Sequence, residues 1–393
     1  MASLTRREYK KKAADSALDE ATEIVSDLDN WRDAWPTLIE KINSTRIELR
    51  VSALQSMNKI LTARYLGYED LQPYLDDTVN CLHGPIMDRA SRAEHDEALG
   101  VLCNLAMNTF AEFEPFLRVF LNDIMPTLSD MHEEESFRFF AIAFAVSLSV
   151  SHQDLCLNVI KKLISLMMNK KSRTTDFTPE MLAECLKAIC LLAATFEDQV
   201  VAETLLADLQ GLLDLAISNH KPLVILAALD LVPIIYEAIV TNEIQNPTEN
   251  GVSVVASKQF AAKYKTKLAS LGQDLPKKAD QKAVFQKTQE INNIFDGETV
   301  EEELTLNNQN VTISGVRPVY ILQAIRRVTR VHFQNQMSEN LDVQNLFGYQ
   351  LLSTQHALRL KKKHKSEIQR DRVVSKKERE MAIEKKRRQK DGL

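Results

Sequence analysis

Hydrophobic residues recur every three or four positions along most of residues 31–240, which is the spacing of one face of an α-helix. A clear example is the set Ile47, Val51, Leu54, Met57 and Leu61. The same spacing predicts further helices over about 70–83, 87–110, 114–129, 134–150, 153–169, 179–195, 199–218 and 222–240. Pro126 and Pro233 lie inside two of these segments and are expected to kink or end them.

Successive helices in units of about forty residues, without strands between them, are typical of an armadillo or HEAT-like α-solenoid. The chain has 393 residues, of which only 10 are glycine and 11 proline. A β-sandwich or barrel would need more turns than these residues provide, so the fold is expected to be mainly α. We therefore predict a polar leader over 1–30 and an armadillo-like repeat domain over 31–240, with an irregular helical bundle as the alternative.

A turn-rich linker over 241–256 is predicted to separate the repeats from a small mixed α/β module over 257–350. Helices are expected over 257–271, 278–296 and 318–340, with a short one ending near Phe347. Alternating apolar and polar residues flank an Asn-rich turn at 307–310, which predicts a short β-hairpin or two extended segments. The apolar residues of this alternation are Leu304, Leu306, Val311 and Ile313.

Two residues near the end of this module carry specific expectations. Phe347 lies at helical spacing from Val343, so we expect it to be core, with Phe347→Ala costing about 3–5 kcal/mol. The alternative is that its ring stacks on RNA bases. Asn340 lies at a short interruption, where its side chain is expected to cap a helix over 341–347. Asn340→Ala would then cost about 1 kcal/mol, and Asn340→Asp would be nearly neutral.

The end of the chain differs sharply in charge from the rest. Residues 359–393 carry 15 Lys and Arg against 6 Asp and Glu, a net of +9, whereas the other 358 residues carry 34 against 48, a net of −14. We predict a basic helical tail over 351–393, rich in residues that favour helix. Its cations form four clusters: Lys361, Lys362, Lys363 and Lys365; Arg370 and Arg372; Lys376, Lys377 and Arg379; and Lys385, Lys386, Arg387, Arg388 and Lys390.

As a helix, residues 354–390 would form a rod about 55 Å long with cations on several faces. Such a rod could enter an rRNA-walled channel, gaining affinity from counterion release without reading sequence. A nuclear import signal is a second interpretation. A solvated helix stabilised by i,i+4 pairs is a third. We expect all fourteen clustered cations to bind RNA.

A candidate second RNA-facing patch lies on the predicted helix after Pro318. It consists of Arg326, Arg327, Arg330 and His332. Apolar residues such as Ile321, Leu322 and Ile325 are interleaved with these cations, so an ordinary amphipathic helix is the favoured alternative for each of them.

Sequence motifs for catalysis or cofactor binding are missing. No two glycines lie within ten residues of each other, which excludes a P-loop and a Rossmann fingerprint. His132 has no second histidine at zincin spacing, and Cys185 and Cys190 lack the CxxC spacing of a metal site. We therefore predict no enzyme activity, cofactor or metal. Five cysteines, an odd number, and the lack of an apolar leader or spanning segment favour a cytoplasmic location, with the nucleus as a further one.

Three segments of the second region resemble the interferon-related developmental regulator family. They are KKADQKAVFQKTQEINNIFDGE, EEELTLNNQNVTISGVRPVYI and HFQNQMSENLDVQNLFG, within about residues 277–348. Gln336 stands where a histidine is usual in the family, and Gln344 where an arginine is usual. INSTRIELRVSALQSMNKIL more loosely resembles the family's first repeat, and the tail resembles its basic C-terminus in composition. At the positions that characterise the family in these segments, this chain has Phe285, Gly297, Glu298, Asn340 and Phe347.

The resemblance implies a non-enzymatic regulator. Members are described as transcriptional co-regulators and as factors that occupy idle ribosomes with a C-terminal helix in the tRNA and mRNA space. We expect a ribosome- and rRNA-associated regulator of translation whose tail competes with tRNA or mRNA. The alternative is a nuclear armadillo-type scaffold that binds transcriptional regulators, its protein partners, on its concave face, with the tail as import signal. Neither a membrane nor a small-molecule substrate is expected.

Overall fold

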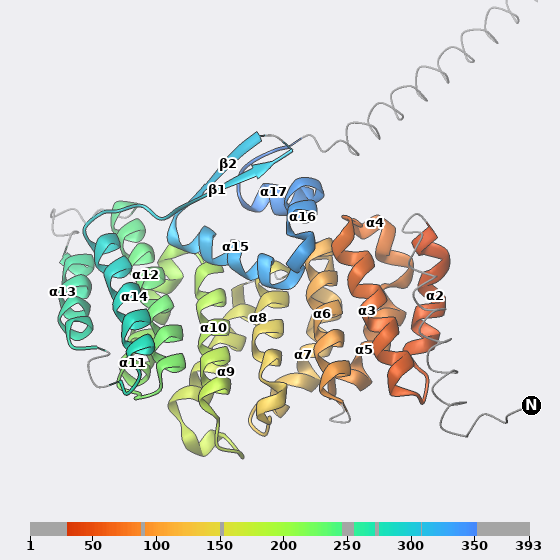
Figure 1. The fold of residues 1–393 in the computed structure, drawn as a ribbon, viewed down its shortest axis with the longest axis horizontal. Helices are drawn as coiled ribbons and strands as arrows, with labels where there is room; N and C mark the ends of the chain where they lie inside the picture. Colours follow the sequence, from red (N-terminus) through yellow and green to blue (C-terminus); the bar gives the residue numbers. More distant parts are fainter. Residues whose placement is uncertain are drawn as a thin grey trace, which may run out of the picture.

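The computed structural model describes residues 30–87, 91–149, 153–245, 255–271, 275–307 and 309–351. The leader expected over 1–30 therefore lies almost wholly outside the described residues, and the tail from 352 lies entirely outside them. The described part is an armadillo-like α-solenoid followed by a smaller module of helices and one β-hairpin (Figure 1).

One row of long helices forms the centre of the solenoid, each packed against the next (Figure 1). We call these helices the central row: α3 (Ile47–Ala63), α6 (Arg92–Thr109), α8 (Phe137–Ser149), α10 (Pro179–Thr195) and α12 (Pro222–Gln245). A second row covers it, consisting of α2 (Trp31–Ile42), α5 (Leu75–Met87), α7 (Glu114–Thr127), α9 (Gln153–Met168) and α11 (Leu206–Ile217). The helices predicted from periodicity over 31–240 are thereby confirmed.

Short elements connect the two rows. α4 (Tyr68–Leu71) lies between α3 and α5, and a π-helical turn at Val200–Leu205 leads into α11. Single 3₁₀ turns lie at Gln72–Tyr74, Phe110–Phe113, Glu133–Glu135 and Lys170–Ser172.

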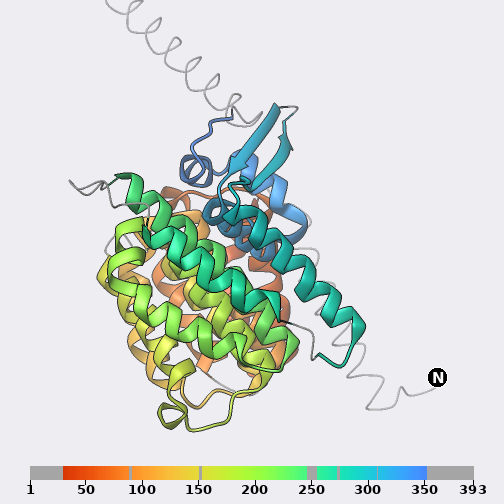
Figure 2. The same cartoon turned by 90° about the vertical axis from the view of Figure 1, so that its left-hand side faces the viewer.

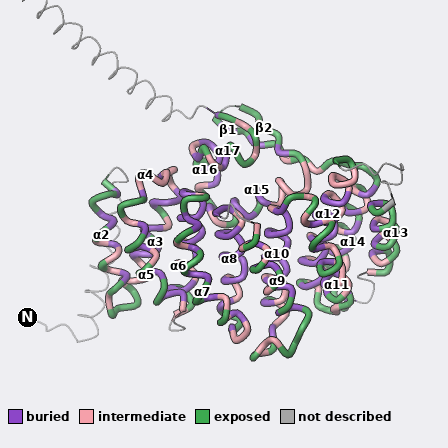
Figure 3. The backbone as a smooth tube through the Cα atoms, turned by 180° about the vertical axis from the view of Figure 1, so that it is seen from behind, coloured by how far each residue is buried: buried purple, intermediate pink, exposed green. Residues whose placement is uncertain are grey.

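Burial explains why the central row is so apolar. α8 and α10 are apolar on nearly all sides because each is enclosed by two row neighbours and the second row. Figure 3 shows the buried segments running along the array from α3 to α12. All five cysteines are free and buried in the solenoid.

α12 does not end at Pro233, and the helices on either side of the expected linker reach into it. α12 continues through Pro233 to Gln245, because its contacts with α10, α11 and α14 hold the helix together across the missing N–H. The linker expected over 241–256 overlaps both neighbouring helices, because α12 ends at Gln245 and α13 begins at Val255. In the part of the chain that the structure describes, α12 alone is long and apolar enough to span a membrane by length and composition. Most of its apolar side chains pack inside the array, whereas Leu223 and Ile244 are exposed.

The second region begins with two helices, α13 (Val255–Ala269) and α14 (Lys278–Phe295), which extend the array beyond α12. The predicted hairpin is confirmed: β1 (Glu301–Leu306) pairs antiparallel with β2 (Gln309–Ser314), with Leu306 opposite Gln309. Asn307 adopts a left-handed φ of 48°, which asparagine tolerates well.

The single helix expected over 318–340 does not form. α15 (Val316–Thr329) ends where Arg330 adopts a φ of 51°, and a 3₁₀ turn (Arg330–His332), α16 (Phe333–Glu339) and α17 (Leu341–Leu346) follow. We call Val316–Leu346 the strap. The bend at Arg330 depends on tertiary contacts, because α15 lies on α10 and α12 whereas α16 contacts α3 (Figures 1 and 2).

Candidate functional site

The strap begins at a carboxylate supplied by the array. Glu237 on α12 accepts hydrogen bonds from the backbone N–H groups of Val316 and Arg317, both at 2.9 Å. A negative charge is favourable there because the first N–H groups of a helix lack intrahelical partners. Arg317 also donates from Nε to the carbonyl of Ala194, at 3.1 Å, and its guanidinium pairs with Asp198. These contacts fix the start of α15 on α10 and α12.

The middle of the strap is held by two arginines of the candidate second patch. Arg327 pairs with Glu184 of α10 at 2.9 Å, and its guanidinium lies 4.1 Å from the ring centre of Phe140. Arg326 pairs with Glu302 of β1 and lies 4.5 Å from the ring centre of Phe333. Both side chains therefore attach α15 to its neighbours.

Arg330 and His332, the other two residues of that patch, lie at the bend after α15. Arg330 is exposed and His332 is half-buried, and neither forms an ion pair with a described residue. Val331 between them is 89% exposed. The structure thus separates the four residues into two that hold the strap and two at the bend that form no ion pair with a described residue.

The far end of the strap is held by three buried amide side chains, Gln336, Asn340 and Gln344. Gln336 donates from Nε2 to the carbonyls of Leu61 and Thr62, at 2.9 and 3.1 Å, and also to Arg64. These carbonyls belong to the end of α3, where the last turn leaves carbonyls without helical partners. The amide thereby closes α3 and attaches the strap to it.

Asn340 caps α17, as expected. Its Oδ1 accepts from the N–H groups of Asp342 and Val343, at 3.0 and 3.1 Å. Its Nδ2 has a second role, donating to the carbonyl of Met107 at 2.9 Å and to Oε1 of Gln336 at 3.2 Å. An aspartate has no amide to donate, so the expectation that Asn340→Asp is nearly neutral is wrong.

Gln344 fixes the point from which the tail leaves. Its Nε2 donates to the carbonyl of Ser338, and its Oε1 accepts from the N–H of Leu351, both at 2.8 Å. Leu351 is buried, and nearby Tyr349 donates its hydroxyl to the carbonyl of Met337 at 2.8 Å. The chain is therefore anchored up to the last described residue. The fourteen clustered cations of the tail lie outside the described residues.

Phe347 lies at the C-terminal end of α17, with its N–H bonded to the carbonyl of Val343 at 3.3 Å. Its side chain is half-buried and packs against the core. The expectation that it is core is therefore only partly met, because one side of the ring remains open to solvent.

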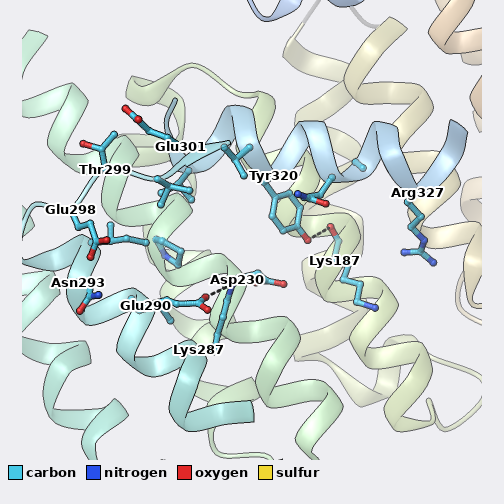
Figure 4. Close-up of a pocket in the computed structure, with 18 of the residues that line it drawn as sticks. Lys187, Asp230, Lys287, Glu290, Asn293, Glu298, Thr299, Glu301, Tyr320 and Arg327 are labelled. Atoms are coloured by element: carbon cyan, nitrogen blue, oxygen red, sulfur yellow. Dashed lines mark hydrogen bonds and ion pairs between the residues drawn. The ribbon is translucent and has the colours of Figure 1, made fainter. Parts of the chain in front are cut away.

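A cleft of about 740 Å³ lies between α15 and helices α10, α12 and α14 (Figure 4). Lys287 pairs there with Asp230 at 2.9 Å and with Glu290 at 3.6 Å. Burial alone would lower the pKa of Lys287, but the two carboxylates outweigh burial and raise it. Tyr320 donates to the carbonyl of Lys187 at 3.5 Å. These internal pairs occupy Lys287, Asp230 and Glu290, and the carboxylates of Glu298 and Glu301 also line the cleft.

Nucleophilic and metal chemistry also find little support in the described part of the chain. Burial raises the pKa of Cys81 to about 12 and that of Cys156 to about 11, and it raises the other three thiol pKa values further. Thiols so protonated are poor nucleophiles. No group of three or more His, Cys, Asp or Glu residues that could hold a metal occurs among the described residues.

Sequence reasoning missed most of the residues that attach the strap. Glu237 and Asp198 lie in helices about 80 and 120 residues before their partners and carry no local signal. The amides were detectable in part: Gln336, Asn340 and Gln344 recur every four residues, the spacing of one helix face.

Comparisons with known proteins bear on the fold. No protein-family model matches the chain, and no curated protein matches it. Among solved structures, it is similar to the designed armadillo repeat protein YIII(Dq)4CqI, at 18% identity and a TM-score of 0.39. The match covers 65% of this chain and 99% of that chain. The helix arrangement described above defines an armadillo-like helical-repeat fold.

Proposed function

We propose that the protein is a non-enzymatic, ribosome- and RNA-associated regulator of translation, related to the interferon-related developmental regulator family that its sequence resembles. The observation that carries the proposal is the anchor at Leu351. A tail of net charge +9 begins eight residues beyond a buried, hydrogen-bonded position. A polycation that starts from a fixed point on a scaffold is suited to enter a phosphate-walled channel in one orientation.

The charge of the remaining chain supports the same mechanism. Its net of −14 disfavours adhesion to RNA over the whole surface, so attraction is concentrated where cations gather. The tail would compete with tRNA or mRNA for space and for phosphate contacts. The protein would act stoichiometrically, with the array and strap holding the tail in position.

The nuclear scaffold is the weaker alternative. It needs a free face for protein partners, yet the strap already takes carbonyl and carboxylate groups of α3, α6, α10 and α12. A partner on this side of the central row would have to displace those contacts or bind around them.

Sedimentation of ribosomes through sucrose tests the proposal. The full chain should co-sediment with ribosomes, and ribonuclease treatment that fragments rRNA should release it. Deleting 359–393 should abolish most of the binding without changing the melting temperature, because the described core ends at Leu351. A variant whose 359–393 residues are scrambled in order should keep most of its binding, since counterion release does not depend on sequence. Unchanged binding after the deletion would refute the proposal.

A further inference from the structure

One face of α14 combines exposed cations with an exposed aromatic ring. Phe285 is 67% exposed, although phenylalanine is usually buried. The opposite face packs inward through Val284, Thr288, Ile291 and Phe295. We call the exposed residues at spacings of four, three and four the α14 stripe: Lys278, Lys282, Phe285 and Gln289.

The positive charge of this stripe is free. Lys277, Lys278 and Lys282 are exposed and form no ion pair with any described residue. The neighbouring lysines have ion-pair partners: Lys263 and Lys267 share Asp214, Lys265 pairs with Asp296, and Lys287 pairs with Asp230. The unpaired lysines of α14 lie in its first turns, where the helix N-terminus also favours anions, and Asp280 in the same turn offsets part of their charge.

Two classes of partner could cover such a surface, RNA and an acidic protein. Lysine is depleted in protein–protein interfaces, whereas lysines beside an aromatic ring are the usual means of holding a single strand. The stripe also has a limited length. Lys278 to Gln289 spans about 16 Å, and Glu290 and Glu298 carry opposite charge beyond it.

We propose that the α14 stripe binds single-stranded RNA, as a contact separate from the basic tail. Phe285 stacks on an unpaired base, Lys278 and Lys282 contact the flanking phosphates, and the Gln289 amide reaches a base edge. Stacking needs a base that is free of a partner strand, so duplex RNA is bound by the lysines alone.

A tryptophan in place of Phe285 reports binding at this position in the full-length chain. Trp31 and Trp35 are buried at 3% and 0% exposure, so a Phe285→Trp variant adds an exposed emitter of its own. The matched control is Val119→Trp on α7, where Val119 is 68% exposed. The probes are a twelve-nucleotide oligouridine, a twelve-base-pair RNA duplex, heparin and an oligoglutamate peptide.

Oligouridine should quench the added emission of Phe285→Trp in a saturable way, and duplex RNA and heparin should quench it far less. Adding Lys278→Gln and Lys282→Gln should raise the oligouridine concentration at half-quenching about tenfold. The same double change at exposed Lys161 and Lys170 should leave that concentration within about twofold. Phe285→Ala should leave the melting temperature unchanged.

Equal quenching of Phe285→Trp and Val119→Trp by oligouridine would overturn the inference. So would a response of Phe285→Trp to oligoglutamate but not to oligouridine, which would assign the stripe to an acidic protein. Deletion of 359–393 tests the tail separately, because quenching of the added emission in Phe285→Trp reports binding at α14. Lost ribosome binding on deletion of 359–393, together with no quenching, would refute the stripe and leave the proposed function standing.

Discussion

The Asn340→Asp substitution tests how the strap is attached to the array, because it replaces only the side-chain NH₂ group by oxygen. The oxygen that caps α17 is retained, and only the donating NH₂ is lost. In its place a carboxylate oxygen would face two acceptors, the carbonyl of Met107 at 2.9 Å and Oε1 of Gln336 at 3.2 Å. Asn340 is fully buried, so water cannot replace the lost donors.

The expected cost follows from these contacts. Two donated hydrogen bonds are lost, at about 1 kcal/mol each, and the two acceptors left without a donor in the interior add a further 1–3 kcal/mol. The negative charge at the start of α17 returns about 0.5–1 kcal/mol. We therefore expect Asn340→Asp to lower the free energy of unfolding by about 3 kcal/mol at pH 7, in contrast to the near-neutral effect predicted from sequence.

Equilibrium urea unfolding measures this difference, with Asn345→Asp as the control. Asn345 lies on the same short helix but is exposed, so its substitution adds the same charge without burial. Burial raises the folded-state pKa of the introduced carboxyl above its unfolded value of about 3.9. The protonated form can donate one hydrogen bond, so the variant's deficit should be smallest at low pH and grow as pH rises through the raised pKa.

Two results would refute the reasoning about Asn340. One is an Asn340→Asp variant as stable as Asn345→Asp at pH 7. The other is a deficit that does not change between pH 5 and pH 8. Either would mean that the amide contact to Met107 contributes nothing in solution.

Two further predictions concern the Phe347 side chain and the binding of metals and nucleotides. Because Phe347 is half-buried, Phe347→Ala should lower the free energy of unfolding in urea by about 1–2 kcal/mol, less than the loss of a fully buried ring. Unchanged stability together with lost ribosome co-sedimentation would instead assign the Phe347 ring to a binding surface. The purified protein should contain no stoichiometric metal, and ATP or GTP should not raise its melting temperature; one zinc per chain by elemental analysis, or a shift of several degrees with nucleotide, would contradict this.

The sequence predicts the parts of this fold that depend on local pattern. The three-and-four spacing of Ile47, Val51, Leu54, Met57 and Leu61 corresponds to α3, and the alternation around the Asn-rich turn corresponds to the hairpin. In both cases the apolar face that a single element must bury is visible in the sequence without knowledge of its partner.

The parts that depend on distant contacts could not be predicted. Apolar residues continue through Val328, Val331 and Phe333, so nothing local marks the break at Arg330, which forms because α15 and α16 contact different helices. Likewise, the cap made by Asn340 follows from its position, but its donor role depends on Met107, which lies 233 residues earlier.

The candidate second patch illustrates a related difficulty. A sequence of cations on a helix does not reveal which of them already have partners. Arg326 and Arg327 are paired with Glu302 and Glu184, whereas Lys278 and Lys282 of α14 form no ion pair with a described residue. Charge count alone therefore does not separate the cations that hold the fold together from those without an ion-pair partner in the described part of the chain.

The most direct test of the central claim is the salt dependence of ribosome binding. The dissociation constant for purified ribosomes is measured between 50 and 300 mM salt for the full chain and for a variant with Lys385, Lys386, Arg387, Arg388 and Lys390 changed to glutamine. If the tail contacts rRNA phosphates, the slope of log K against log salt should be steep and should fall by about 3–4 in the variant. A shallow slope, or the same slope for both proteins, would contradict the proposal that the basic tail binds the ribosome through its RNA.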